Sequence, residues 1–142
     1  MVLSRVRLQD ARHLLPKQLS GGMRQRAAIG RALVVRPSVM LMDEPFSSLD
    51  RHTRDLLIDD LIALWVRQPF TAVYVTHNMD EAIRLGHRVV VLSSRPSTIR
   101  GIVAIDTPLI ERQFCSPDLA EKRLQLTELI NASAAGRELT HA

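Results

Sequence analysis

A glycine turn that opens a helix, followed by an apolar strand with two acidic residues at its end, constrains this chain more than any other feature. The turn is Ser20-Gly21-Gly22, and Ser20 is a favourable N-cap for the helix that follows. The apolar run Val39–Met42 is typical of a strand that is buried on both faces of a parallel sheet. The carboxylates Asp43 and Glu44 follow this run directly. Because ligands of α/β sheets bind at the carboxyl ends of the strands, we expect both carboxylates to lie at a binding edge.

The rest of the hydrophobic pattern alternates between helical and strand-like segments. A helix is predicted to begin after Asp50, because apolar residues from Leu57 to Trp65 recur at helical spacing. Together these segments predict an α/β sheet that ends in an antiparallel hairpin. The predicted helices are 4–14, 20–35, the segment after 50, 78–85 and 117–130, and the predicted strands are 39–42, 71–76, 88–92 and 99–105.

The predicted elements divide the chain near Pro37. We expect residues 1–36 to form an all-helical piece and residues 37–131 to form the sheet-containing piece. Residues 132–142 are mainly small and polar, so we expect a flexible tail. With 142 residues, 46% of them apolar and 24% charged, the chain has a globular composition and can bury a core.

Composition and charge exclude several classes of protein. The net charge of +4 raises nucleic acid as a partner, but the arginines are spread along the chain and aromatic residues make up only 4%, so none is expected. The chain has no apolar run of 18 residues, and residues 1–7 lack the apolar core of a signal peptide. The single Cys115 cannot form an internal disulfide, and we expect a buried or half-buried thiol without a role. A cytoplasmic protein is therefore expected.

The turn before the helix at residue 20 has the chemistry of a phosphate cradle. Backbone N–H groups at a helix N-terminus are unpaired and carry partial positive charge, so they receive phosphate oxygens well. Gly21 and Gly22 let the backbone approach an anion, and the Ser20 hydroxyl adds a donor. A turn before any helix can have this composition, so Ser-Gly-Gly alone is weak evidence for phosphate binding. The pattern becomes specific only together with Gln25 and the residues around it.

The acidic pair after residue 42 suits hydrolytic chemistry. Asp43 could hold Mg²⁺ directly or through a water, and Glu44 could orient or deprotonate an attacking water. The alternative for such a pair is a helix cap or a solvated loop. His77 follows the next predicted strand and should lie at the same edge, where its imidazole could donate to a terminal phosphate. A lone histidine is more often structural.

Several of these motifs resemble those of one family, the ATP-binding cassette (ABC) ATPases. Leu19–Gln25 is similar to the family's signature motif and Met40–Pro45 to its Walker B motif. Ser47–Asp50 resembles the D-loop, and Thr76-His77 resembles the switch histidine. The resemblance extends from about Leu15 to Leu129. It implies ATP and Mg²⁺ as ligands, with Glu44 and His77 catalytic, Asp43 at the metal, and Ser20, Gly21, Gly22, Gln25 and Asp50 at the nucleotide.

The resemblance also implies a fold, partners and a place in the cell. The fold would be a partial P-loop NTPase fold in which residues 1–36 are the end of the helical subdomain. A second ATPase subunit would bind head to tail, and transmembrane permease subunits would hold the pair at the inner face of the membrane. Met23–Arg26 and Asp80–Ala82 look like bacterial importers, and Leu92–Pro96 resembles the nitrate, sulfonate and taurine import branch.

The sequence departs from the family in one major respect. No glycine begins the phosphate-loop pattern G-x-x-x-x-G-K-[ST], and neither Lys17 nor Lys122, the only lysines, follows a glycine. The Walker A half, with the adenine-stacking aromatic and the Q-loop glutamine, would precede the signature. Three interpretations remain: an importer ATPase subunit whose amino-terminal half lies in another polypeptide or was lost, a catalytically inert remnant or interaction module, and a DNA-maintenance ABC ATPase. The hairpin at residues 92–96 and the absence of heptads count against the third.

Overall fold

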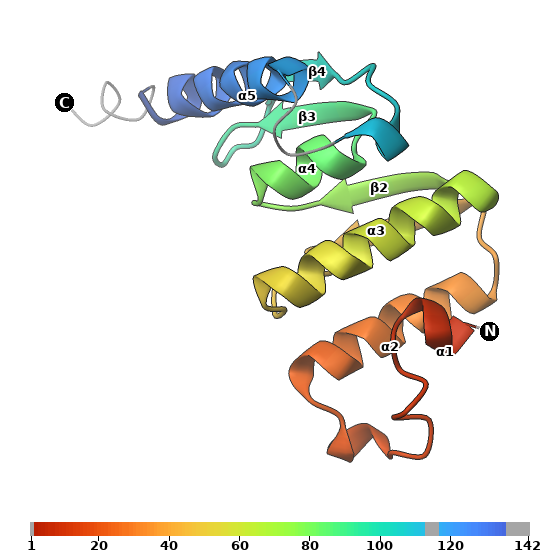
Figure 1. Ribbon diagram of the computed structural model, residues 1–142. Helices are drawn as coiled ribbons and strands as arrows, with labels where there is room; N and C mark the ends of the chain where they lie inside the picture. Colours follow the sequence, from red (N-terminus) through yellow and green to blue (C-terminus); the bar gives the residue numbers. More distant parts are fainter. Residues whose placement is uncertain (1, 113–116, 136–142) are drawn as a thin grey trace. The chain divides into compact units, whose positions relative to one another are not determined.

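The computed structural model describes residues 2–112 and 117–135, which fall into two compact units, Met1–His77 and Asn78–Ala142. Alternating helices and strands confirm the predicted α/β class (Figure 1). Cys115 and residues 136–142 of the predicted tail lie outside the described residues. The predicted boundary near Pro37 stays a prediction. The first unit comprises α1 (Val2–Arg5), the 3₁₀ turn η1 (Pro16–Gln18), α2 (Gly21–Val34), β1 (Val39–Asp43), α3 (Arg51–Arg67) and β2 (Thr71–Val75).

The first helix ends far earlier than the predicted range 4–14. α1 ends at Arg5, and Arg7 has a φ of 54° in the left-handed region. The amide of Leu8 donates to the carbonyl of Leu3 at 2.8 Å, and the amide of Arg7 donates to the carbonyl of Ser4 at 3.2 Å. This pair of bonds closes a helix end. The turn buries Leu8, so the longer predicted helix was wrong because tertiary burial overrides the local apolar pattern.

α2 begins as predicted at the Ser20 cap, whose Oγ accepts from the amide of Met23 at 3.2 Å. α1 packs against α2 (Figure 1), and the contact includes Val2 of α1 and Gly30 of α2. A Cβ added at Gly30 would lie 3.3 Å from Val6 and 3.5 Å from Val2, so a larger side chain there would crowd the contact with α1 and the residue that follows it. The small residues of α2 therefore allow the close approach expected of a thin helix.

The sheet of the first unit contains β1 and β2, which are parallel and in register from Val39 opposite Thr71 to Asp43 opposite Val75. The crossover between them is α3, which begins at the Asp50 cap. At its end the indole Nε1 of Trp65 donates to the carbonyl of Phe70 at 2.8 Å. This arrangement puts the residues that follow both strands at one edge.

The two faces of β1 differ in burial. Met40 and Met42 are buried, but Val39 is 55% and Leu41 is 77% exposed. The prediction that this strand is buried on both faces was therefore wrong. Val73 and Val75 of β2 are also half exposed, so apolar side chains of both strands contribute to an open surface. A two-stranded sheet with a helix on one side leaves its other face without cover among the described residues.

This open face predicts self-association of the chain. Exposed apolar patches and unpaired strand edges favour aggregation. The double variant Leu41→Glu, Val73→Glu should be more monomeric than the parent, with about 0.5 kcal/mol or less change in unfolding free energy because both side chains are exposed. Sedimentation velocity at several concentrations measures this, with Leu124→Glu on the second unit as the control, since Leu124 is 60% exposed. A parent chain that is monomeric and melts cooperatively at high temperature would contradict the prediction.

The second unit comprises α4 (Met79–Leu85), β3 (Arg88–Leu92), β4 (Ile99–Ala104), the 3₁₀ turn η2 (Leu109–Glu111) and α5 (Pro117–Ala135). β3 and β4 form the predicted antiparallel hairpin. α5 extends past the predicted end at residue 130 and packs on β4, where a Cβ at Gly101 would meet Leu129 at 2.7 Å. The core of this unit consists of Ile83, Val91, Val103, Ile105, Leu119 and Leu126. Across residues 2–112 and 117–135, every helix is too short or too polar to span a bilayer.

One buried arginine ties this unit together. The side chain of Arg112, 5% exposed, donates through Nη1 to the carbonyls of Ile83 at 2.8 Å and Gly86 at 2.7 Å, both at the end of α4. Its Nη2 donates to the carbonyl of Ile105 at 3.1 Å and its Nε to that of Thr107 at 2.8 Å. Burial lowers the pKa of Arg112, and Asp118 acts against that shift. The guanidinium thus supplies donors to helix carbonyls that have no partner within the helix.

Candidate functional site

The carboxyl edge of the β1–β2 sheet brings together two of the residues singled out from the sequence. The amide of Glu44 donates to the carbonyl of Val75 at 2.9 Å, which extends the parallel pairing by one residue beyond Asp43. His77 follows β2, and its Nδ1 lies 2.8 Å from Oε1 of Glu44. The structure thus places Glu44 and His77 in contact at the predicted edge. Both side chains remain open to solvent, with 43% of Glu44 and 75% of His77 exposed.

The backbone of Glu44 is strained. Its φ is 43°, a left-handed conformation that costs a residue with a side chain roughly 1–3 kcal/mol. The neighbouring Pro45 and Phe46 are buried, and the ring of Phe46 lies 6.1 Å from that of Tyr74. Buried neighbours on its carboxyl side and the bond to Val75 on its own amide hold the turn in place. These contacts, which hold the left-handed backbone of Glu44 in place, fix the direction in which the carboxylate leaves the sheet edge.

The side chain of Gln25 connects α2 to the loop that carries the acidic pair. Its Nε2 donates to the carbonyl of Glu44 at 3.0 Å, and its Oε1 accepts from Oγ of Ser48 at 2.5 Å. Both ends of the amide are therefore used within the protein. The sequence pattern singled out Gln25 as a nucleotide contact and did not reveal this bridging position, because the bridge depends on how the helix and the loop pack.

Gly21 and Gly22 at the N-terminus of α2 have different surroundings. No atom lies within 4 Å of the position of a Cβ at Gly21, so the backbone there is open to an approaching group. A Cβ at Gly22 would lie 2.6 Å from the end of the Leu49 side chain, so a larger residue there would require this side chain to move. Ser20 accepts from the helix amide, which leaves its hydroxyl hydrogen available to an anion. This helix end can receive an anion at Gly21 and Ser20.

Asp50 serves locally as the N-cap of α3, where its Oδ1 accepts from the amide of Thr53 at 2.9 Å. This bond lowers the pKa of Asp50 below its ordinary value of 3.8. The cap therefore stabilises the helix above the ordinary pKa, and the contribution is lost as the pH falls through the lowered one. Its predicted contact with a nucleotide stays a prediction.

Asp43 is the one predicted metal ligand, and its exposed side chain lies at the end of β1. Within the part of the chain that the structure describes, no group of three His, Cys, Asp or Glu residues is placed to hold a metal ion. A single carboxylate does not make a zinc-type site. It fits Mg²⁺, which is commonly held by one or two carboxylates together with substrate phosphates and waters.

Comparison with known proteins gives the class of protein that this fold and site define. The family model for ABC transporters matches residues 1–47. An uncharacterized ABC transporter ATP-binding protein of Methanocaldococcus jannaschii is 48% identical over 101 residues, 71% of this chain and 38% of the relative. The aliphatic sulfonates import ATP-binding protein of Bacillus licheniformis is 41% identical over 107 residues, 75% of this chain and 42% of the relative.

The solved structures agree. The dimeric post-hydrolysis structure of an ATP-binding cassette with bound ADP and phosphate matches 63% of this chain and 38% of that chain, with 37% identity and a TM-score of 0.58. The predicted family and fold are thereby confirmed: the chain has the sequence and fold of an ABC transporter ATPase domain. It spans about half, or less, of the length of the curated relatives that it matches.

Proposed function

We propose that this chain is the signature-helix and Walker B portion of an ABC importer ATPase that energises uptake of a small anion or organic solute of the nitrate, sulfonate or taurine type. The observation that carries the proposal is the contact of Glu44 with His77 at the sheet edge, on a loop held by Gln25 of α2. The similarity to an aliphatic sulfonates import protein supports the choice of cargo class. The role of every site residue is part of this proposal.

The proposal gives each group a distinct task. Glu44 would accept a proton from the attacking water, while His77 holds one oxygen of its carboxylate and keeps it aimed. If Nδ1 of His77 donates to Glu44, then Nε2 can also donate to a phosphate only in the imidazolium form. Asp43 would hold Mg²⁺, which supplies charge neutralisation at the phosphates. Ser20 and Gly21 would receive the terminal phosphate at the N-terminus of α2.

The proposal requires partners. The sequence has no G-x-x-x-x-G-K-[ST] pattern, so ATP would have to be held by a phosphate loop on a different polypeptide segment. A second ATPase subunit would bind head to tail, and permease subunits would place the pair at the inner face of the membrane. The missing pattern also favours the second candidate, an inert remnant or interaction module. Supplying an amino-terminal half with a phosphate loop distinguishes the importer ATPase from the inert remnant. An importer ATPase should then hydrolyse ATP in the presence of Mg²⁺, and an inert remnant should not. The isolated chain should show no hydrolysis.

The signature-helix role gives a prediction for the completed cassette. Gly21→Asp adds a negative charge at the open helix end, which opposes an incoming phosphate. ATP binding to the phosphate loop should be nearly unchanged. Size-exclusion chromatography with ATP, under conditions that prevent hydrolysis, should show the loss of ATP-driven dimers. Gly21→Ala is the matched control, because a methyl group fits in the open space there. Dimers of Gly21→Asp equal to those of the parent would remove α2 from the interface.

A further inference from the structure

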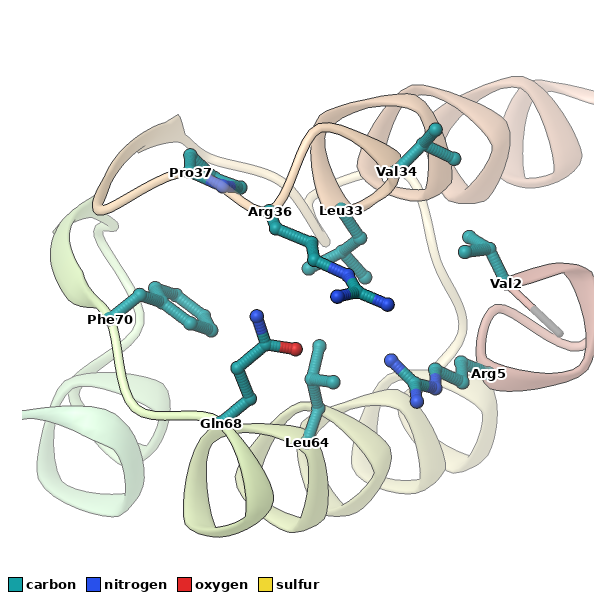
Figure 2. A pocket seen from close by; sticks show the side chains of 9 residues that line it. All are labelled: Val2, Arg5, Leu33, Val34, Arg36, Pro37, Leu64, Gln68 and Phe70. Carbon is teal, nitrogen blue, oxygen red and sulfur yellow. The ribbon is translucent and has the colours of Figure 1, made fainter.

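A pocket at the other end of the sheet has a polar lining that the candidate ATPase site does not use. It has a volume of about 250 Å³ and lies between α1, the end of α2 and the end of α3, all in the first unit. Figure 2 shows the guanidinium groups of Arg5 and Arg36 and the amide of Gln68 pointing into one space. Leu33, Leu64 and Phe70 form apolar walls around them. The pocket therefore combines concentrated positive charge with apolar surface.

No carboxylate lines this pocket beside its two arginines, although Arg5 also lines a neighbouring pocket that contains Asp60. None of the lining residues is acidic. Within residues 2–112 and 117–135, the structure gives no hydrogen bond or ion pair to the side chain of Arg5 or Arg36. Guanidinium groups match carboxylate, sulfonate and phosphate oxygens through paired N–H donors. Two unpaired guanidiniums in one concavity thus point to an anionic ligand.

The backbone of Arg36 ends α2 and positions its side chain. Its φ is 48°, and it precedes Pro37, which restricts its backbone further. The amide of Arg36 donates to the carbonyl of Leu33 at 3.3 Å, so this left-handed residue closes the end of α2 just as Arg7 closes the end of α1. This helix-ending turn places the Arg36 side chain at the pocket (Figure 2).

The pocket is distinct from the proposed ATPase site. β1 begins just after Pro37, which lines the pocket, and ends at Asp43, which lies at the opposite edge of the sheet. A strand of this length spans about 13 Å. A ligand in this pocket would therefore not occupy the position proposed for ATP.

We propose that this pocket binds a small amphipathic anion, with a carboxylate or sulfonate head between Arg5 and Arg36 and a short aliphatic tail against Leu33, Leu64 and Phe70. The volume is slightly below the range of roughly 300–1,000 Å³ that is typical of drug-sized ligands, which suits a short chain. The amide of Gln68 adds a donor to the head group. This proposal stands independently of ATP hydrolysis.

Fluorescence of the single tryptophan tests the proposal on the full chain. Trp65 donates to the carbonyl of Phe70, a pocket residue, so its emission should report binding at micromolar protein concentration. Sodium hexanoate and hexane-1-sulfonate should bind with a Kd of about 1 mM or lower, and hexan-1-ol and inorganic phosphate at least about tenfold more weakly. Equal binding of hexan-1-ol would show an apolar pocket only, and equal binding of phosphate would show an unspecific charge effect. Either result, or no binding of the two anions, overturns the proposal.

Variants separate the pocket from the general positive charge of the chain. Arg36→Gly removes the guanidinium and accepts the positive φ, so the fold should survive, and the Kd for hexanoate should rise by about tenfold or more. Arg5→Gln should have a similar effect. The matched control is Arg31→Gln, because Arg31 lies in the last turn of α2 but outside the pocket. This change should leave the Kd for hexanoate within about twofold. A Kd unchanged in Arg36→Gly, with an unchanged melting temperature, would overturn the assignment.

Discussion

Replacing Glu44 by glutamine in a cassette completed with a phosphate-loop half should lower ATP hydrolysis by about 10²- to 10⁴-fold. The amide can still accept the hydrogen bond from His77, so the local geometry is kept, but it cannot take a proton from water. ATP binding and ATP-driven dimerisation should persist, and the dimer should last longer because hydrolysis no longer ends it. Single-turnover hydrolysis and size-exclusion chromatography with ATP measure the two effects separately.

The matched control is Glu128→Gln, the same chemical change on an exposed position of α5. It should hydrolyse ATP at the parental rate. If Glu44→Gln retained more than about a tenth of the parental rate, the proton-accepting role would be wrong and the Glu44–His77 contact would be structural. Loss of dimerisation in both Glu44→Gln and Gly21→Asp would instead indicate a disturbed interface.

Replacing Arg112 by alanine should destabilise the second unit by about 3–5 kcal/mol, because buried carbonyls of Ile83, Gly86 and Ile105 lose their donors. α4 has only seven residues and gains little stability alone, so its end depends on this contact. Arg112→Lys should recover part of the loss, because an ammonium has three donors and no planar fork. Urea unfolding followed by circular dichroism measures the free energies.

The control for Arg112 is Arg100→Gln, an arginine exposed on β4. It should change the unfolding free energy by about 0.5 kcal/mol or less. A comparable loss in both variants would mean that net charge, and not the buried donor set, stabilises the unit. Equal stability of Arg112→Ala and the parent would show that water replaces the guanidinium at these carbonyls.

Features set by local sequence were predictable. The Ser20 and Asp50 caps lie where the sequence put them, and the side chain of Asn78 accepts from the amides of Asp80 and Glu81 at the start of α4. The shared edge of Glu44 and His77 was also predictable, because parallel strands end on the same side.

Features that depend on distant packing were not predictable. The left-handed turn at Arg7 arises from burial of Val6 and Leu8, which the local helical pattern does not reveal. Arg112 looks like any surface arginine in the sequence, because the carbonyls that it binds are mostly more than twenty residues away. The apolar run of β1 by itself indicates burial on both faces, because such a run shows that a strand is suited to burial and does not show what covers it. The unpaired arginines of the pocket come from two helix ends that only the fold brings together.

The bridge made by Gln25 has a mechanical consequence. The amide binds the carbonyl of Glu44 and the hydroxyl of Ser48 at once, so the N-terminal half of α2 cannot move without breaking two bonds or carrying the acidic loop with it. An anion that draws this helix end toward itself would then pull on the strained turn at Glu44, and the carboxylate would be displaced as a unit with the helix. Anion binding at the start of α2 and proton acceptance by Glu44 would then be coupled, because Gln25 joins the helix to the loop that carries the carboxylate.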